Sequence, residues 1–347
     1  MGDPATPVVM LMDHVEPAYG SDKCGLVWAY LLAPGQSAVE LQSDAVQRWL
    51  VTLPQRPNEF LWLHLSLSNA AAERWMRSHL NLPEAFYQSC HEQISSTRVD
   101  QEDSALTAVI HDVLFDSTLD TSTVSTVNVC VGQQLLVSAR LRPLRSVDRL
   151  RAAIRQGAIF QSSFELFSHL LRDQAGVFVD ILRQSTIRVD EIEDKILESR
   201  TSVSRRELGA LRRMLVRLQR LLAPEPAALF RLLRQPPAWI ADGDAQDLRQ
   251  AAEEFSAVVV DSVALVERVK LLQEELVALL NEQTNRTLFV LTLVTVMALP
   301  INLVAGLFGM NVGGIPLAQS SDGFWIVVAT LAAVTGLLAY LVSRRKD

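Results

Sequence analysis

The sequence predicts an α+β domain with a mixed sheet, followed by long stalk helices and a C-terminal transmembrane hairpin of two helices. Three observations support this fold class. Short β-rich runs alternate with helical patterns up to about residue 160, and strand signals then stop. Charged residues become rare after residue 286, where the remaining ones are Asp322, Arg344, Arg345, Lys346 and Asp347.

The first predicted domain covers residues 1–160. Its strand-like runs are rich in β-branched, aromatic and other apolar residues, and they cover residues 24–32, 59–67, 107–115, 124–131 and 134–140. Helical patterns lie between them over residues 69–80 and 83–94. Strands that alternate with helices in this way predict an α/β domain whose sheet contains parallel and antiparallel pairs.

Residues 161–286 form the predicted helical stalk. Helical spacing with dense charge covers residues 163–200 and 204–235, and two prolines at 236–237 end the second pattern. A third helical pattern starts near Asp244 and contains neither Pro nor Gly before Pro300. It predicts one continuous helix of at least about 55 residues, which is about 80 Å long at 1.5 Å per residue.

Two uncharged runs predict the transmembrane helices, at residues 287–310 and 323–343. Helices of these lengths would be roughly 36 Å and 32 Å long, enough to cross a hydrocarbon core of about 30 Å. The loop at residues 311–322 contains no Lys or Arg, whereas Arg286 precedes the first run and basic residues occupy the tail at 344–347. The positive-inside rule therefore places both termini in the cytoplasm and makes the N-terminal domain cytoplasmic.

Composition excludes several classes of protein. The formal net charge of −7 argues against a duplex nucleic-acid binder, and the 49% of apolar residues argues against a disordered chain. The sequence contains no P-loop, nucleophile elbow or paired-carboxylate motif, so no catalytic residue, enzyme activity or cofactor is expected. The six histidines show no metal-binding spacing, and the Cys90–His91 and His111–Asp112 pairs are the least implausible exceptions.

The end of the first apolar run carries a short motif. Gly309-Met310-Asn311 is followed by Val312-Gly313-Gly314-Ile315-Pro316, after about 300 residues predicted to be cytoplasmic. In this context the chain resembles the CorA superfamily of divalent-cation transporters, and the Gly-Gly-Ile-Pro segment looks most like its ZntB zinc-transporter branch. The resemblance implies a homopentamer with a cytoplasmic funnel, a pore lined by the first span, and proton-coupled transport of zinc and similar ions across the bacterial inner membrane.

One face of the first span can be read from its spacing. We name this face the seam; its members recur at steps of three and four residues and are Asn285, Leu288, Thr292, Thr295, Leu299, Asn302, Gly306 and Gly309. Polar groups in lipid are costly and usually face protein or water, so the seam is predicted to line the pore. The alternative is close helix packing through its small residues.

The predicted outer mouth consists of Gly309, Met310 and Asn311, and the loop residues Gly313, Gly314 and Asp322 follow it. A ring of Asn311 amide oxygens would suit a hydrated divalent cation, although Gly and Asn also simply end helices. Neither span offers Cys, His or a carboxylate, the ligands that Zn²⁺ prefers, so ligand chemistry does not separate zinc from magnesium. The nearest candidates for a proton relay are Asp322 and Glu282.

Extending the seam backward along the long helix brings Glu253, Glu267 and Glu274 onto the same face. Around an axis of symmetry these residues would form anionic rings that concentrate cations. The alternative is an ordinary solvated helix face. The Asp190–Asp194 acidic stretch is likewise interpreted as a solvated face rather than an ion sensor.

These features together favour a pentameric inner-membrane transporter of Zn²⁺, Cd²⁺, Ni²⁺ and Co²⁺. The expected partners are further copies of the chain and the lipid bilayer, and no resident metal is assigned. A magnesium or cobalt channel of the same superfamily is the first alternative. A membrane-anchored cytosolic scaffold is the second, and it would need neither the polar seam nor the Gly-Met-Asn end.

Overall fold

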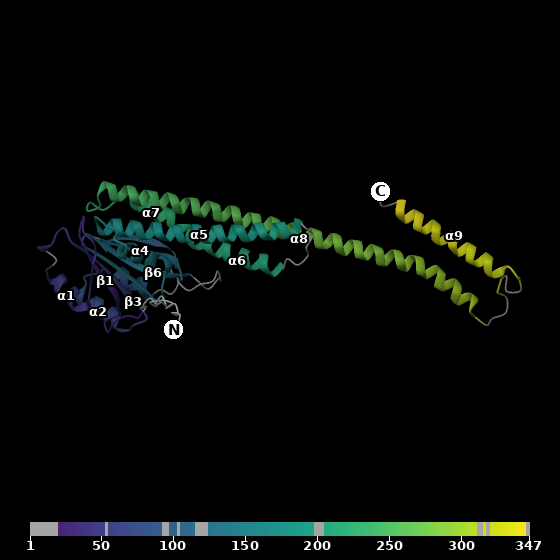
Figure 1. Cartoon of the computed structure of the whole chain (residues 1–347), viewed down its shortest axis with the longest axis horizontal. Helices are drawn as coiled ribbons and strands as arrows, with labels where there is room; N and C mark the ends of the chain where they lie inside the picture. Colours follow the sequence, from purple (N-terminus) through teal and green to yellow (C-terminus); the bar gives the residue numbers. More distant parts are fainter. Residues whose placement is uncertain are drawn as a thin grey trace, which may run out of the picture. The chain divides into compact units, whose positions relative to one another are not determined.

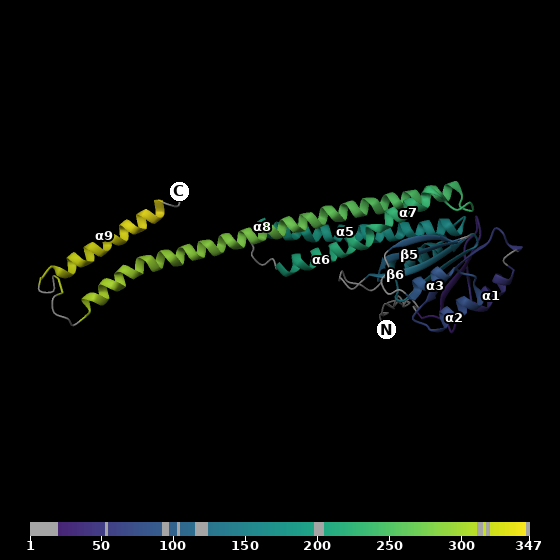
Figure 2. The same ribbon diagram turned by 180° about the vertical axis from the view of Figure 1, so that it is seen from behind.

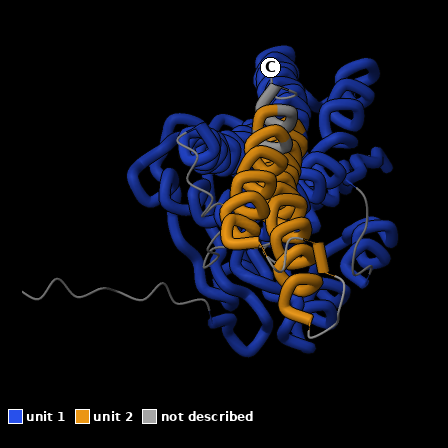
Figure 3. Tube along the Cα trace, turned by 90° about the vertical axis from the view of Figure 1, so that its right-hand side faces the viewer, with its two compact units in different colours: residues 1–270 blue, residues 271–347 orange. Residues whose placement is uncertain are grey.

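The computed structural model describes residues 20–52, 55–91, 97–102, 105–114, 124–197, 205–310, 315–316 and 320–344. The chain divides into two compact units, residues 1–270 and residues 271–347 (Figure 3), and each is considered by itself. Helix α8 (Asp242–Phe308) contributes to both units, because its first 29 residues belong to the first unit.

A seven-stranded sheet forms the centre of the first unit, with the strand order β2-β1-β3-β7-β6-β5-β4. Strands β3 and β7 pair in parallel, and the other neighbours pair antiparallel, so the predicted α+β domain with a mixed sheet is confirmed. The strands are β1 (Leu26–Leu32), β2 (Val39–Leu41), β3 (Phe60–Ser66), β4 (Arg98–Glu102), β5 (Ala105–Val113), β6 (Val124–Gly132) and β7 (Leu135–Arg140).

Helices cover both faces of this sheet because the central strands are apolar on both sides, and all seven residues of β3 are buried. One face packs against α1 (Ser43–Val51), α2 (Ala71–His79) and α3 (Glu84–His91), which contribute Trp49, Trp75, Met76, Phe86 and Tyr87 to the core. Gly25 allows α2 to approach β1, since its φ is +84° and a Cβ there would lie 2.5 Å from the Cβ of Ala72.

The other face of the sheet packs against α4 (Arg145–Arg155) and α5 (Ser163–Leu197), as Figures 1 and 2 show from opposite sides. Trp28 stacks on His64 here with ring centroids 4.2 Å apart, and the Arg151 guanidinium lies 4.3 Å from the Trp28 ring centroid. The result is a three-layer arrangement of helices, sheet and helices.

The predicted strand runs match β1, β3, β5, β6 and β7 to within two residues at each end. The edge strands β2 and β4 were not predicted, because β2 has three residues and β4 (RVDQE) is polar and partly exposed. Such short polar edge strands lack the alternation that marks a half-buried strand, and they also protect the sheet from pairing with other chains. Helices α1 and α4 were also not predicted.

The helical stretch predicted over residues 204–235 consists of two helices, α6 (Arg205–Leu222) and α7 (Pro224–Arg234). Pro224 lacks a backbone N–H, and proline is preferred in the first turn of a helix. It therefore begins α7 rather than continuing α6. The predicted break after residue 235 is also present, since α7 ends at Arg234.

The second unit contains residues 271–308 of α8 and helix α9 (Gly323–Arg344). Among the described residues, α8 is long and apolar enough to cross a membrane by length and composition, and its most apolar 18 residues have a mean hydropathy of 2.3. None of that stretch is buried within the chain. In α9 the apolar segment found by the same measure is shorter, Gly323–Leu337.

Candidate functional site

The part of α8 that belongs to the first unit has two distinct faces. Phe255, Val258, Leu265 and Val269 are buried against the rest of the first unit, and Ser262 lies among them. The predicted acidic positions lie on the other side, where every residue of the extended seam is exposed: Glu253, Ala257, Val260, Ala264, Glu267, Leu271, Glu274, Ala278 and Asn281. This face makes no contribution to the core of the chain and is available to a partner or to solvent.

The three seam glutamates are not equivalent. Glu267 forms an ion pair with Lys270, with 3.3 Å between Oε2 and Nζ, one turn along the same helix. A lysine at this position offsets part of the negative charge of Glu267 at short range. The sequence spacing of three residues could have indicated this pair. The acidic character of the seam therefore depends mainly on Glu253 and Glu274.

The seam residues first predicted from the apolar run are exposed as well, at Asn285, Leu288, Thr292, Thr295, Leu299, Asn302 and Gly306. Most other residues of α8 between 281 and 308 are also exposed, so exposure alone does not single out this face. Thr295 Oγ1 donates to the carbonyl of Leu291 at 2.9 Å, which satisfies its hydroxyl within the helix. Its second lone pair stays available to a ligand or water.

The packing of α8 against α9 distinguishes the faces more clearly. Pro300, Val304 and Phe308 of α8 line an apolar groove of about 280 Å³ together with residues of α9, which are Ile326, Val327, Thr330, Leu331 and Val334. At about 100° per residue, Thr295, Leu299, Asn302 and Gly306 centre about 180° around α8 from this α9-facing side. The seam therefore lies on the side of α8 that faces away from α9. Its role in lining a pore stays a prediction.

Helix α8 ends at the predicted mouth. The backbone N–H of Gly309 donates to the carbonyl oxygen of Ala305 at 2.9 Å. A Cβ at Gly309 would lie 3.1 Å from the same carbonyl oxygen. Met310 is about half exposed. Asn311, Gly313 and Gly314 lie outside the described residues, so their predicted roles stay predictions. Asp322 is exposed immediately before α9.

No group of three or more His, Cys, Asp or Glu side chains that could hold a metal occurs within the described parts of the chain. In the acidic stretch near residue 190, Asp190 pairs with Arg268 at 2.7 Å, and Glu193 also binds Arg268. Because Arg268 already forms ion pairs with these two carboxylates, they are less available to bind a metal ion, which argues against an ion sensor at this position.

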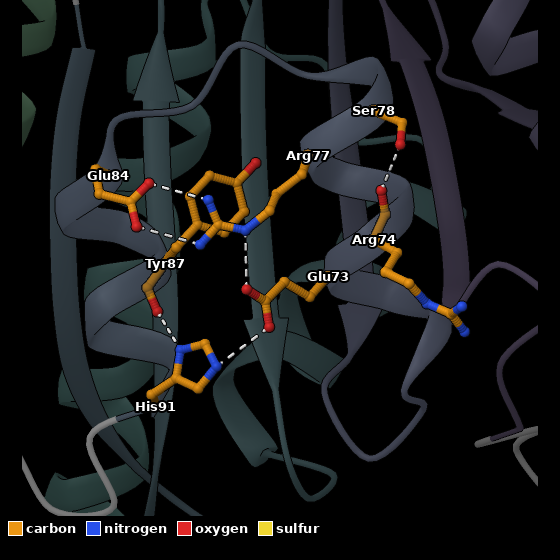
Figure 4. Close-up of polar contacts among 7 residues, drawn as sticks. All are labelled: Glu73, Arg74, Arg77, Ser78, Glu84, Tyr87 and His91. Atoms are coloured by element: carbon orange, nitrogen blue, oxygen red, sulfur yellow. Dashed lines mark hydrogen bonds and ion pairs between the residues drawn. The ribbon is translucent and has the colours of Figure 1, made fainter.

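His91, one member of the Cys90–His91 pair noted in the sequence, belongs to a polar cluster on α2 and α3 (Figure 4). His91 Nε2 lies 3.2 Å from Glu73 Oε2, and Arg77 binds Glu73 and Glu84 while its guanidinium lies over the Tyr87 ring. Burial is the main cause that raises the pKa of the Cys90 thiol to about 12, and the charge of Glu73 acts in the same direction. A protonated thiol is a poor metal ligand, so this cluster is a structural one.

His64 is buried between two strands and is also structural. Arg140 Nε donates to His64 Nε2 at 2.6 Å, and the opposite ring nitrogen therefore donates to Ser138 Oγ at 2.7 Å. Ser138 accepts a further hydrogen bond from Trp62 Nε1 at 2.8 Å. Burial, together with the charges of Arg140 and Arg151, holds the pKa of His64 well below its ordinary value.

Sequence inspection missed one buried group, Glu225. It follows Pro224, the first residue of α7, and is 1% exposed on the inner face of this helix. The helical spacing of Leu222, Glu225, Leu229 and Leu232 places this carboxyl at a core position, a signal that was present in the sequence.

Comparison with known proteins now adds to this geometry. The sequence model of the family described as CorA-like Mg²⁺ transporter protein matches residues 57–345. The zinc transport protein ZntB of Pectobacterium atrosepticum is 25% identical over 288 residues, which cover 82% of this chain and 87% of that protein. The divalent cation transporter CmaX of Pseudomonas aeruginosa is 26% identical over 322 residues, 91% of this chain and 95% of that protein.

Solved structures agree with the fold. Full-length CmaX superposes with a TM-score of 0.79 at 24% identity and covers 93% of this chain and 99% of its own. The CorA magnesium transporter of Methanocaldococcus jannaschii gives a TM-score of 0.73 at 18% identity, over 90% of this chain and 96% of its own. The family match spans more than four-fifths of the sequence, and the mixed sheet and long helix described above fit it. This chain belongs to the family of CorA-like Mg²⁺ transporter proteins.

Proposed function

We propose that the chain is a homopentameric inner-membrane transporter of Zn²⁺ and of the related cations Cd²⁺, Ni²⁺ and Co²⁺. The position of the polar seam carries this proposal, because the seam occupies the side of α8 opposite the α9-facing side. A pair of helices that only anchors a protein needs no polar face directed away from its partner. A water-filled pathway between several copies does need one.

Several copies are required, since two helices enclose no lumen, and closed rings are the usual form of such assemblies. The exposed apolar residues Val260 (66%) and Leu271 (62%) on the seam also favour self-association. The number five follows the family resemblance. In this assembly residues 287–310 and 323–343 span the membrane, residues 311–322 lie outside, and residues 1–160, 161–286 and 344–347 lie in the cytoplasm.

The outer mouth is assigned to Asn311, next to the close backbone turn at Gly309. Five amide oxygens in a ring would hold a cation that keeps part of its water. Gly306 supports this assignment, because no described atom outside the backbone of its own helix lies within 4 Å of a Cβ built there and a small residue leaves room along the pathway.

The choice of zinc follows the ZntB relatives, whose name states zinc transport. Magnesium transport is the second candidate, and it is favoured by the oxygen-only seam and by the family described for Mg²⁺. Proton coupling would involve groups outside the two spans, and the proposed relay residues are Asp322 and Glu282.

Flux into vesicles tests this proposal directly. The purified chain is reconstituted, and uptake of Zn²⁺ and of Mg²⁺ is measured with and without a pH gradient. The proposal predicts Zn²⁺ uptake that exceeds Mg²⁺ uptake and increases with an inward proton gradient. Uptake of Mg²⁺ alone would favour the second candidate, and uptake of neither ion would favour a membrane-anchored scaffold.

A further inference from the structure

Glu225 lies at the junction of three elements in the first unit. Its Oε1 accepts hydrogen bonds from Gln174 Nε2 on α5 at 3.0 Å, from Thr97 Oγ1 at 3.1 Å, and from the backbone N–H of His111 on β5 at 3.4 Å. Thr97 directly precedes β4, against which α7 packs. One carboxylate oxygen thus joins α7 to a sheet edge and to α5.

The second oxygen of this carboxyl is in a different position. Glu225 Oε2 is buried and has no hydrogen-bond partner among the described residues. If Glu225 were ionised, this oxygen would carry negative charge in an apolar interior without a donor. Protonation removes that charge and leaves the three hydrogen bonds to Oε1 in place.

The groups around Glu225 determine how readily it ionises. Burial is the main cause that raises the pKa of Glu225 to about 8, and the nearby charge of Asp112 acts in the same direction. The hydrogen bonds from His111, Gln174 and Thr97 oppose this shift. Of these neighbours, His111 and Asp112 are themselves titratable. Asp112 is also fully buried, and burial raises its pKa to about 6 against the hydrogen bonds it accepts from Ser146 and Val113.

We propose that Glu225 is a proton-binding site that holds α7 against the sheet edge when it is protonated and loosens α7 when it loses the proton. The helix is well placed for such a response. It is connected to α6 through Ala223 alone and to α8 through residues 235–241. The ligand is H⁺ from the solution on the side of the first unit, and this inference does not depend on which ion the chain transports.

The wild-type chain is expected to show a specific pH dependence. Opening of α7 exposes Glu225, whose pKa then returns to its ordinary value near 4.3. Because the closed state binds the proton more tightly, the equilibrium constant for opening increases about tenfold per pH unit up to about pH 8 and is constant above it. Between pH 6 and pH 8 the protection of α7 amides should therefore fall by about 50-fold.

Hydrogen exchange of the full-length chain, measured by mass spectrometry and corrected for intrinsic exchange, tests this expectation. In Glu225→Gln, which mimics the protonated acid, the protection of α7 should not depend on pH. Asp112→Asn is the matched control and should keep a fall, displaced toward lower pH because the charge of Asp112 no longer raises the pKa of Glu225. A Glu225→Gln variant with the wild-type pH profile, or a wild-type profile without the fall, would overturn the proposal.

A second measurement on the unmodified chain avoids reliance on variants. Infrared difference spectra between pH 6 and pH 9 should show loss of a protonated carboxyl C=O band with a midpoint near pH 8. If no protonated carboxyl titrates in this range, Glu225 is not the proton-binding site.

Discussion

The three seam glutamates allow a quantitative test of how the N-terminal half of α8 acts on ions. In a pentamer Glu253, Glu267 and Glu274 would each contribute five carboxylates to one axial face. Neutralising all three to Gln should lower the local concentration of divalent cations without changing which ion is preferred. Selectivity should stay the same, because the proposed Asn311 ring is unchanged.

The size of this effect follows from the surface potential. Potentials of this kind reach several kT, and a change of only about 1 kT per unit charge alters the local concentration of a divalent cation by about sevenfold. The screening length is about 30 Å at 0.01 M salt and about 8 Å at 0.15 M. When the ion concentration is below saturation, the flux of the triple Gln variant should therefore fall several-fold at low salt and by about twofold or less at physiological salt.

The structure also predicts an order among the three positions. Because Lys270 offsets Glu267 at 3.3 Å, Glu267→Gln alone should have a smaller effect than the double change at Glu253 and Glu274. Flux into vesicles at two salt concentrations measures this. The matched control replaces three acidic residues about 100° around the same helix from the seam, namely Glu254→Gln, Asp261→Asn and Glu275→Gln. An equal loss of flux in the seam and control variants, or no loss of flux in either, would refute the idea of an acidic pathway along the seam.

Three further changes test other parts of the chain. Asn311→Ala should abolish uptake while the oligomer stays assembled in size-exclusion chromatography, and near-normal Zn²⁺ flux would remove Asn311 from the mechanism. Asn302→Leu should dewet the pathway at that level and abolish flux, and unchanged flux would mean that the seam is assigned to the wrong face. Ser138→Ala should lower the free energy of unfolding by about 2–4 kcal/mol, because Trp62 and His64 each lose a buried acceptor. Chemical denaturation measures this loss, and Ser78→Ala on the exposed surface of α2 should change the free energy by about 0.5 kcal/mol or less.

The central sheet was predictable because its strands are apolar on both faces. The run at residues 59–67 contains β3, and its nearly continuous apolar residues reflect burial of both faces of the strand under helices. The edge strands β2 and β4 could not be predicted in this way, because they gain their structure from hydrogen bonds to a neighbour rather than from buried side chains.

The candidate site was predictable to a different degree along α8. Heptad spacing identified a face that is exposed from Glu253 to Asn285, since a helix continues the same periodicity over many turns. Sequence alone did not reveal the ion pairs of Arg268 with Asp190 and Glu193, because these residues are far apart in the chain. The environment of Glu225 depends on Thr97, His111 and Gln174 from three other segments, and no local pattern brings these together.

Cysteine accessibility along α8 tests most directly whether the seam lines a water-filled pathway. In a background without Cys24, Cys90 and Cys130, single cysteines are placed at Thr295 and Asn302 on the seam and at Val304 on the α9-facing side. We predict that a membrane-impermeant, water-soluble thiol reagent labels the two seam positions, that Zn²⁺ slows this labelling, and that position 304 stays unlabelled. Labelling at position 304 with none at positions 295 and 302 would contradict the account.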